Sequence, residues 1–420
     1  MIRKILISAL LILFGVLLAF GVLEIFVRVS GKTPPTGEPA FFWQDDERFG
    51  WFHTPGAEGY YFNPPGEYNA YAKVNSAGFI DQEYTQEKPA GVYRILVVGD
   101  SFTEGLRVPM EATFHSILEK ELNAAGKRVE VINAGVAGWG TDQELLFYQE
   151  VGRAYQPDMV LLAFFPGNDI MNNTIALESK NFGAVRKPYF LLEDGRLALH
   201  NQPVGSESEP VTAEDNAAPA PQLIPEHPPL AFLLPVLQHS AFYRYFIPRL
   251  RVLAPGLALK LAQWGLITPG SETRRAEQET DYVPITYGVY KTPLDPPWQE
   301  GWHITQALLA QFKSNVETDG GEFRVAVIPS QVQVDPAAWA HILQSYPAMQ
   351  EEQWDLDQPN QRLAEILHAQ KTPYLDLLPI FRAWDGPPLF FPIDGHWNEQ
   401  GHRLAGESLT RWLMDIVPSS

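Results

Sequence analysis

RILVVG (residues 94–99) is a continuous apolar run that leads into a turn, DSFTEG (residues 100–105). A run without polar alternation is typical of a strand buried on both faces of a parallel sheet. Apolar residues at helical spacing fill residues 114–125, and two further apolar runs follow at residues 129–132 and 159–165. Strands that alternate with helices predict a parallel α/β sheet.

The same rhythm returns toward the C-terminus. The pattern predicts helices at 304–316, 361–369 and about 399–416, and strands at 323–328 and 374–378. Asn398 stands where an N-cap residue belongs. Farther back, TDQE (residues 141–144) has the form of a capping box and predicts another helix start.

Between these regions the regular pattern lapses, which suggests a division of the chain. We expect the following parts: an N-terminal segment 1–32, an irregular Pro-, Gly- and aromatic-rich lead-in 33–92, a first α/β part 93–175, an insertion or lid 176–300, and a second α/β part 301–417. Within the insertion, the Pro-rich stretch 201–229 predicts a disordered loop.

Composition excludes several functions. The 420 residues contain 31 Lys and Arg against 50 Asp and Glu, a net charge of −19. Such a balance argues against nucleic acid as the main partner, because phosphate binding needs concentrated Lys and Arg. The chain has no cysteine, which excludes disulfides, thiolate zinc sites, iron–sulfur clusters and a cysteine nucleophile.

The N-terminus carries an apolar segment. Residues 5–23 contain no charge, and 19 residues of helix reach about 28 Å, close to the thickness of a bilayer core. We expect a transmembrane anchor with the rest of the chain on the extracytoplasmic (periplasmic or cell-surface) side. The alternative is secretion after cleavage of a signal peptide near Ala19–Gly21, although the run is longer than the apolar region of a signal peptide.

A serine and a histidine stand where catalysis would need them. Ser101 directly follows the first strand, and ligands bind beyond the carboxyl ends of parallel strands. His396 has the chemistry of a base for a serine hydroxyl, and Asp394 that of a carboxylate that orients the imidazole. The alternatives are ordinary turn and helix-entry loops, or a metal site made by Asp394, His396 and His402.

Two further loops offer hydrogen-bond donors. Residues 133–138 (NAGVAG) end the second strand and residues 167–169 (GND) end the third. Acyl transfer needs amide donors for a developing oxyanion. We expect Asp100 and Asp169 to brace these loops, because turn carboxylates bond to nearby backbone amides.

Two tryptophans flank the site sequences. Trp139 and Trp397 are candidate substrate-binding residues that would form a platform for a sugar ring. The alternative is core packing, the usual place of large aromatic side chains.

These motifs together resemble the SGNH hydrolase superfamily, the GDSL esterases and lipases, over about residues 94–175 and 300–415. The resemblance implies a three-layer α/β/α sandwich around a mainly parallel, flavodoxin-like sheet. It also implies Ser101 as nucleophile and oxyanion donor, with Asp394 and His396 completing the triad. Many members space that pair as Asp-x-x-His, whereas Asp-x-His-Trp, as found here, occurs in the related alginate-acetylating periplasmic proteins.

The resemblance also implies the other oxyanion donors. They are the Gly138 amide, with Gly135 as an alternative in the same block, and the Asn168 side chain.

Three functions follow from this reading. The first is an extracytoplasmic serine esterase of the membrane-anchored bacterial type, acting on an O-acylated carbohydrate or lipid-like ester without cofactor or metal. The second is an O-acyltransferase that modifies an exported polysaccharide with the same triad. The third is a non-catalytic binding or scaffold protein, since fold alone does not fix function.

Overall fold

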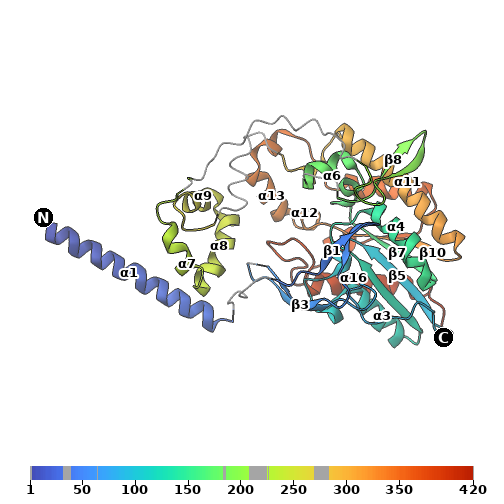
Figure 1. Cartoon of the computed structure of the whole chain (residues 1–420), viewed down its shortest axis with the longest axis horizontal. Helices are drawn as coiled ribbons and strands as arrows, with labels where there is room; N and C mark the ends of the chain where they lie inside the picture. The colour runs from blue at the N-terminus through green and yellow to red at the C-terminus, as the bar shows by residue number, and fades with distance from the viewer. Residues whose placement is uncertain are drawn as a thin grey trace. The chain divides into compact units, whose positions relative to one another are not determined.

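The computed structural model (Figure 1) describes residues 2–31, 39–63, 65–182, 186–207, 225, 227–268 and 283–419. The chain divides into two compact units. We call them the helical unit (Met1–Pro39, Phe62–Asn69 and Ala217–Thr280) and the sheet unit (Ala40–Tyr61, Ala70–Asn216 and Asp281–Ser420).

A five-stranded sheet forms the centre of the sheet unit. Its strands are β5 (Tyr93–Gly99), β6 (Val129–Gly135), β7 (Met159–Phe164), β10 (Glu322–Val327) and β11 (Tyr374–Asp376). Their order is β11-β10-β7-β5-β6, and every pairing is parallel. The prediction of a parallel α/β sheet is therefore confirmed. Numbered along the chain, the strand order is the flavodoxin-like 2-1-3-4-5. The chain adds β6 on one side of β5 and the later strands on the other, so the switch point of the sheet lies beside β5.

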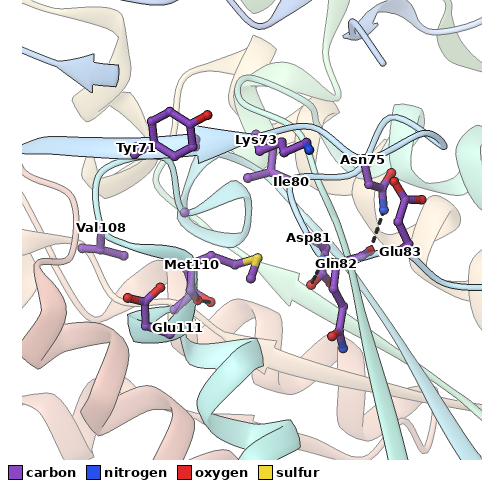
Figure 2. A pocket seen from close by; sticks show the side chains of 13 residues that line it. Tyr71, Lys73, Asn75, Ile80, Asp81, Gln82, Glu83, Val108, Met110 and Glu111 are labelled. Carbon is purple, nitrogen blue, oxygen red and sulfur yellow. Dashed lines mark hydrogen bonds between the residues drawn. The ribbon is translucent and has the colours of Figure 1, made fainter. Parts of the chain in front are cut away.

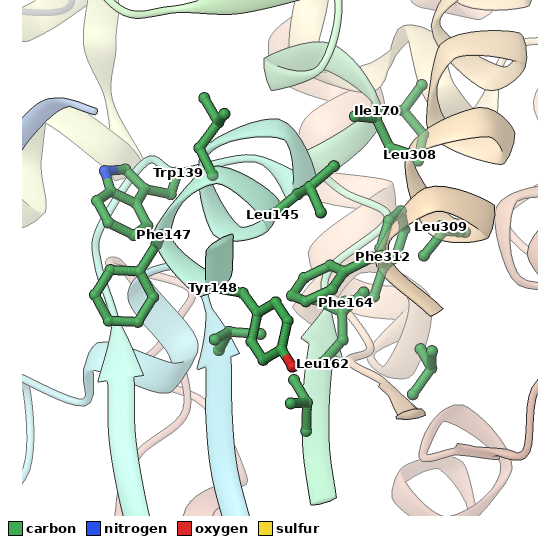
Figure 3. Packing of buried hydrophobic residues seen from close by; sticks show 14 of the residues in the cluster. Trp139, Leu145, Phe147, Tyr148, Leu162, Phe164, Ile170, Leu308, Leu309 and Phe312 are labelled. Atoms are coloured by element: carbon green, nitrogen blue, oxygen red, sulfur yellow. The ribbon is translucent and has the colours of Figure 1, made fainter. Parts of the chain in front are cut away.

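Helices cover both faces of this sheet, because alternate strand residues point to opposite sides. Leu96 and Val98 enter one core and Ile95 and Val97 the other. The first core is closed by α4 (Thr141–Glu150), α11 (Pro296–Thr318) and α14 (Gln358–Ala369). The second is closed by α3 (Phe114–Ala124), α15 (Leu378–Arg382) and α16 (Glu399–Leu413). Figure 3 shows the first core, where aromatic side chains of α4 and α11 meet β7.

Local signals set the helix starts. Asn398 caps α16 as predicted, since its side chain accepts from the amides of Gln400 and Gly401. The predicted capping box at 141–144 is wrong by one position. Gly140 is the N-cap residue of α4, and its amide donates to the Gln143 side chain.

The lead-in is more regular than expected. It contains four short strands in two pairs: β1 (Trp43–Asp46) with β2 (Gly50–His53), and β3 (Glu58–Phe62) with β4 (Asn69–Lys73). The frequent Pro, Gly and aromatic residues hid these strands, because each is only four or five residues long. The description of residues 33–92 as irregular is thus corrected.

The insertion contributes to both units. Its first part forms α6 (Ile175–Phe182) and a hairpin of β8 (Tyr189–Glu193) and β9 (Arg196–His200). Its second part forms α7 (Leu234–Leu237), α8 (Ala241–Leu253) and α9 (Pro255–Gln263) of the helical unit. Most of the predicted disordered loop, residues 208–224 and 226, lies outside the described residues.

The remaining helices are the long α1, the ten-residue α13 and three helices of four residues. They are α1 (Ile2–Val29), α2 (Ser101–Glu104), α5 (Asp169–Asn172), α12 (Gln331–Val334) and α13 (Pro336–Ser345), with single 3-10 turns between some of them. Among the residues described, no helix combines the length and apolarity needed to cross a membrane. The predicted anchor therefore gains no support here and stays a prediction.

Candidate active site

Ser101 is held at the switch point of the sheet by a tight strand-to-helix turn. It opens α2 directly after β5, and the Asp100 carboxylate caps that helix by accepting from the Phe102 amide at 2.9 Å. Gly99 has no room for a side chain, since a Cβ there would lie 2.2 Å from Thr103 Oγ1. The glycine thus lets the turn close tightly enough to present the serine.

The structure brings Ser101 and His396 together across 295 positions of sequence. Ser101 Oγ lies 2.8 Å from His396 Nε2, and His396 Nδ1 lies 2.7 Å from Asp394 Oδ1. The short Asp-x-His spacing works because Gly395 adopts φ +81°, a left-handed conformation that folds the loop back. The imidazole also stacks on the Phe102 ring, with centroids 4.7 Å apart.

Asp394 is held in its ionised form. Burial opposes its charge, but the hydrogen bond with His396 and the nearby positive charge of Arg107 outweigh burial and keep the pKa of Asp394 well below its usual value. Arg107 Nε donates to Asp394 Oδ1 at 2.7 Å. Nothing in the sequence around Arg107 predicts this contact, because its partner lies 287 positions away.

The loop that carries Gly138 is braced from several sides. Glu104 Oε1 accepts from the Ala137 amide at 3.0 Å, and the same oxygen contacts His53 Nε2 at 2.8 Å and Trp43 Nε1 at 2.9 Å. Trp51 Nε1 donates to the Ala137 carbonyl oxygen. The lead-in therefore fixes the backbone on which the Gly138 amide sits.

The two glycines of residues 133–138 have different surroundings. The Gly135 amide donates to Asn133 Oδ1 at 3.0 Å, and a Cβ on Gly135 would lie 2.4 Å from the Glu104 amide nitrogen. Gly135 thus packs β6 against α2. Gly138, at φ +78°, belongs to the turn beyond the strand.

Asn168 is tied to the nucleophile turn. Its Nδ2 donates to Asp100 Oδ2 at 2.9 Å, which leaves the second amide hydrogen for another acceptor. Asp169 Oδ2 accepts from the Phe165 amide at 2.8 Å. Asp100 and Asp169 both brace their loops, as predicted.

Four carboxyl groups are completely buried in this region. They belong to Asp100, Asp142, Glu144 and Asp169. One buried cation, Lys187, bonds to both oxygens of Asp142 at 2.9 and 2.8 Å.

The buried carboxyl groups are strongly perturbed. Burial, followed by the charges of neighbouring carboxylates, raises the pKa of Glu144 and of Asp169 well above the usual values, which favours their neutral forms. Sequence reasoning missed Glu144, which lies on a helix turn assigned to capping.

Neither tryptophan is available to a substrate. Trp139 and Trp397 are completely buried. Trp139 stacks on Phe52 at 5.7 Å and Trp397 on Phe381 at 5.0 Å between ring centroids. The prediction of a sugar platform is wrong, because both rings pack inside the protein.

The metal alternative also fails. His402 is buried on α16, its Nδ1 accepts from the Phe114 amide at 3.3 Å, and burial lowers its pKa to about 3. Within the described residues, no three His, Asp or Glu side chains gather as a metal site.

A cavity of about 400 Å³ lies between the lead-in and the segment that follows α2 (Figure 2). Polar and apolar side chains line it together, among them Tyr71, Lys73, Gln82, Glu83, Met110 and Glu111. Gly105 and Val108 also line it. The same backbone segment carries Arg107, so the cavity and the triad share one stretch of chain.

Comparison with known proteins adds little to this geometry. No family model matches the chain, and no curated protein sequence matches it. Among solved structures it is similar to a lipase/acylhydrolase from Enterococcus faecalis, with 11% identity and a TM-score of 0.38 over 78% of this chain and 98% of that one.

A second similar structure is an acetyl xylan esterase, with 11% identity and a TM-score of 0.36 over 76% of this chain and 98% of that one. A third is a GDSL-like lipase from Bacteroides thetaiotaomicron, with 10% identity and a TM-score of 0.34 over 80% of this chain and 93% of that one. Such low TM-scores carry no inference about this chain. Its fold and chemistry rest on its own sheet and site.

Proposed function

We propose that this chain is a serine esterase whose nucleophile is Ser101. The observation that carries the proposal is the pair of hydrogen bonds from Ser101 Oγ through His396 to Asp394, at 2.8 and 2.7 Å. A serine hydroxyl becomes a competent nucleophile when a base takes its proton and a carboxylate stabilises the resulting imidazolium. Ser101 and His396 side chains that pointed apart would favour the non-catalytic alternative, and their contact at 2.8 Å supports the esterase instead.

The reaction proceeds in two halves. Ser101 Oγ forms a bond to the ester carbonyl carbon while its proton passes to His396 Nε2. The tetrahedral oxyanion is stabilised by the amides of Ser101 and Gly138 and by Asn168 Nδ2. His396 then gives its proton to the alcohol oxygen as the ester C–O bond breaks, which leaves the acyl group on Ser101. In the second half the same imidazole deprotonates a water molecule that attacks the acyl carbon, and it returns that proton to Ser101 Oγ as the acyl–serine bond breaks and the acid leaves.

We also propose that the cavity beside the Arg107 segment holds the alcohol or acyl part of the substrate, because Gly105 and Val108 of the segment after the nucleophile helix line it. Its mixed lining suits a molecule with hydroxyl and apolar groups, such as an O-acylated carbohydrate or a lipid-like ester.

Labelling with a fluorophosphonate tests the proposal. The full chain is expected to react, and Ser101→Ala to lose the label completely. Ser314→Ala, which removes an exposed serine on α11, is the matched control and keeps the label. A folded wild-type chain that stays unlabelled, or a Ser101→Ala chain that is still labelled, contradicts the proposal.

Asn168 offers a second test of the same site. Asn168→Ala removes one oxyanion donor, and loss of one such donor lowers kcat by about 10²–10³ fold. An unchanged kcat on a p-nitrophenyl ester would remove Asn168 from the oxyanion site.

The Asp394-x-His396-Trp397 spacing supports a second function, O-acyl transfer to a polysaccharide. The same acyl-enzyme would form, and a sugar hydroxyl would replace water. Mass spectrometry of an acceptor oligosaccharide separates the two. An acetyl mass shift supports transfer, and free acetate alone supports hydrolysis.

We also propose that the sheet unit works outside the cytoplasm, held at the membrane by the N-terminal segment. The uncharged run at residues 5–23 supports this. Fractionation of cells expressing the chain, with the mass of its mature N-terminus, tests both anchoring and signal cleavage.

A further inference from the structure

The helical unit has a charge balance opposite to the rest of the chain. Between Glu226 and Glu272 there is no Asp or Glu, although the whole chain has 50. The same stretch contains four basic residues, Arg244, Arg249, Arg251 and Lys260. A positive stretch of this length in a chain of net charge −19 suits a negatively charged partner.

The helical unit also places its large apolar side chains outward. Five of them are 50–79% exposed: Phe232, Val236, Leu253, Leu257 and Trp264. We call these five the apolar surface. Several large exposed apolar residues in one small unit favour an interaction site over an ordinary water-facing surface.

Helix α9 shows the arrangement most clearly. Its buried side is made of small residues, Ala258 and Ala262. Its exposed side carries Leu257, Lys260 and Trp264, which recur at helical spacing along one face. A helix with apolar side chains outward and one lysine among them fits the boundary between lipid headgroups and acyl chains.

The helical unit connects this surface to α1. Glu24 of α1 accepts from Ser240 Oγ at 2.7 Å and from the amides of Ala241 and Phe242 at 3.0 and 2.8 Å, so it caps α8. The rings of Phe20 and Phe242 meet edge to face at 5.4 Å. The apolar surface is therefore joined to a helix that itself exposes Leu18, Val22 and other large apolar side chains.

Two of the four basic residues, Arg249 and Lys260, can present their charge to a partner. Arg249 stacks on the Tyr245 ring at 3.7 Å and donates to the carbonyl oxygens of Tyr245 and Pro65, neither of which is charged. Lys260 is exposed. Long basic side chains of this kind lay their stems on apolar surface and place the charge at headgroup level.

We propose that α7–α9 lie on a bilayer that contains anionic phospholipid. Leu253, Leu257 and Trp264 enter the headgroup–acyl boundary, and Lys260 and Arg249 face the lipid phosphates. Trp at this depth is typical of membrane interfaces, and each basic residue near an anionic surface adds to binding. The inference is independent of the esterase proposal.

The absence of cysteine from the chain permits a direct test. Trp264→Cys is labelled with an NBD fluorophore, and the full chain is reconstituted in vesicles of phosphatidylcholine alone or with phosphatidylglycerol. Doxyl-labelled lipid is expected to quench the fluorophore, more strongly when phosphatidylglycerol is present. Leu257→Cys, labelled in the same way, repeats the measurement should Trp264→Cys not fold.

A charge reversal completes the test. Adding Lys260→Glu to the labelled chain is expected to lower the docking equilibrium about fivefold or more in anionic vesicles. Lys120→Glu, at an exposed lysine on α3, is the matched control and leaves the quenching unchanged. Absence of quenching overturns the proposal, and equal quenching in neutral vesicles overturns the role of charge. A signal that follows protein concentration instead of lipid assigns the surface to a protein partner.

Discussion

Asp394 Oδ1 accepts from His396 Nδ1 and from Arg107 Nε, each at 2.7 Å. One oxygen of the triad carboxylate thus serves both the base and an arginine from the segment after the nucleophile helix. Arg107 is therefore a positioning residue, because it fixes the group that orients His396.

Arg107→Met is expected to lower kcat/KM by about tenfold or more, because a misplaced catalytic group costs about 10–100 fold. Arg107→Lys restores part of the loss by returning the charge. Ester hydrolysis by the full-length variants measures both effects. Equal activity of wild type and Arg107→Met would show that His396 alone orients Asp394.

The same contact makes stability depend on pH. The pKa of folded Asp394 lies below its unfolded value, so its contribution is complete above the unfolded pKa, about 4, and is lost as pH falls through the folded pKa. The stability difference between wild type and Arg107→Met should therefore shrink between about pH 5 and pH 2. Urea unfolding at each pH gives the comparison.

Gly395→Ala tests the backbone between the acid and the base. Its φ of +81° is costly for alanine, by about 1–3 kcal/mol, and relief of that strain moves Asp394 away from His396. Both stability and kcat are expected to fall. Gly320→Ala is the matched control: Gly320 has φ +88° and open space around it, so only stability falls. If Gly320→Ala lost activity as well, backbone strain anywhere in the fold would explain the loss in Gly395→Ala, and the position of Asp394 would not be needed to explain it.

Glu104→Ala removes the brace of the Gly138 loop. It leaves the buried His53 and the half-buried donors on Trp43 and Ala137 without their acceptor, which is expected to cost about 2–4 kcal/mol in unfolding free energy. Activity falls too, because the loop shifts. Glu104→Gln keeps an acceptor oxygen and is expected to retain more of both. Thermal unfolding and ester hydrolysis together distinguish this from a purely structural role, in which only stability would change.

Glu144→Gln tests the buried carboxyl cluster. Because the folded pKa of Glu144 is raised, wild-type stability falls as pH rises from the unfolded pKa, about 4, toward the folded one. Glutamine does not ionise and so avoids the cost of a buried charge. The free energy of unfolding of the variant is therefore expected to exceed that of wild type by about 1 kcal/mol at pH 8 and to equal it near pH 4. Chemical denaturation across this range is the measurement. The exposed Glu365→Gln, on α14, should show no such trend.

Features that depend on interactions between residues close in sequence could be predicted from the sequence. The strand at 94–99 and the cap at Asn398 are encoded by neighbouring residues, and both were predictable. The candidates Ser101, Asp394 and His396 were predictable too, because each stands at a strand end or helix entry with the right chemistry.

Features that depend on contacts between residues distant in sequence could not be predicted. Nothing near Arg107 signals a partner 287 positions away. Trp139 is a substrate-binding candidate in sequence because it flanks a site block, but its ring stacks on Phe52 of the lead-in, which is distant in sequence. The lead-in strands themselves are too short for period-two alternation to stand out.

The order of the triad along the chain has a consequence for synthesis. Ser101 is made early, but His396 and Asp394 come from the loop just before the last helix, α16. Until those residues emerge from the ribosome, the serine has neither its base nor the arginine-bound acid. If the chain is the proposed esterase, a growing chain stays unreactive toward esters until Asp394 and His396 have been made and have folded onto Ser101.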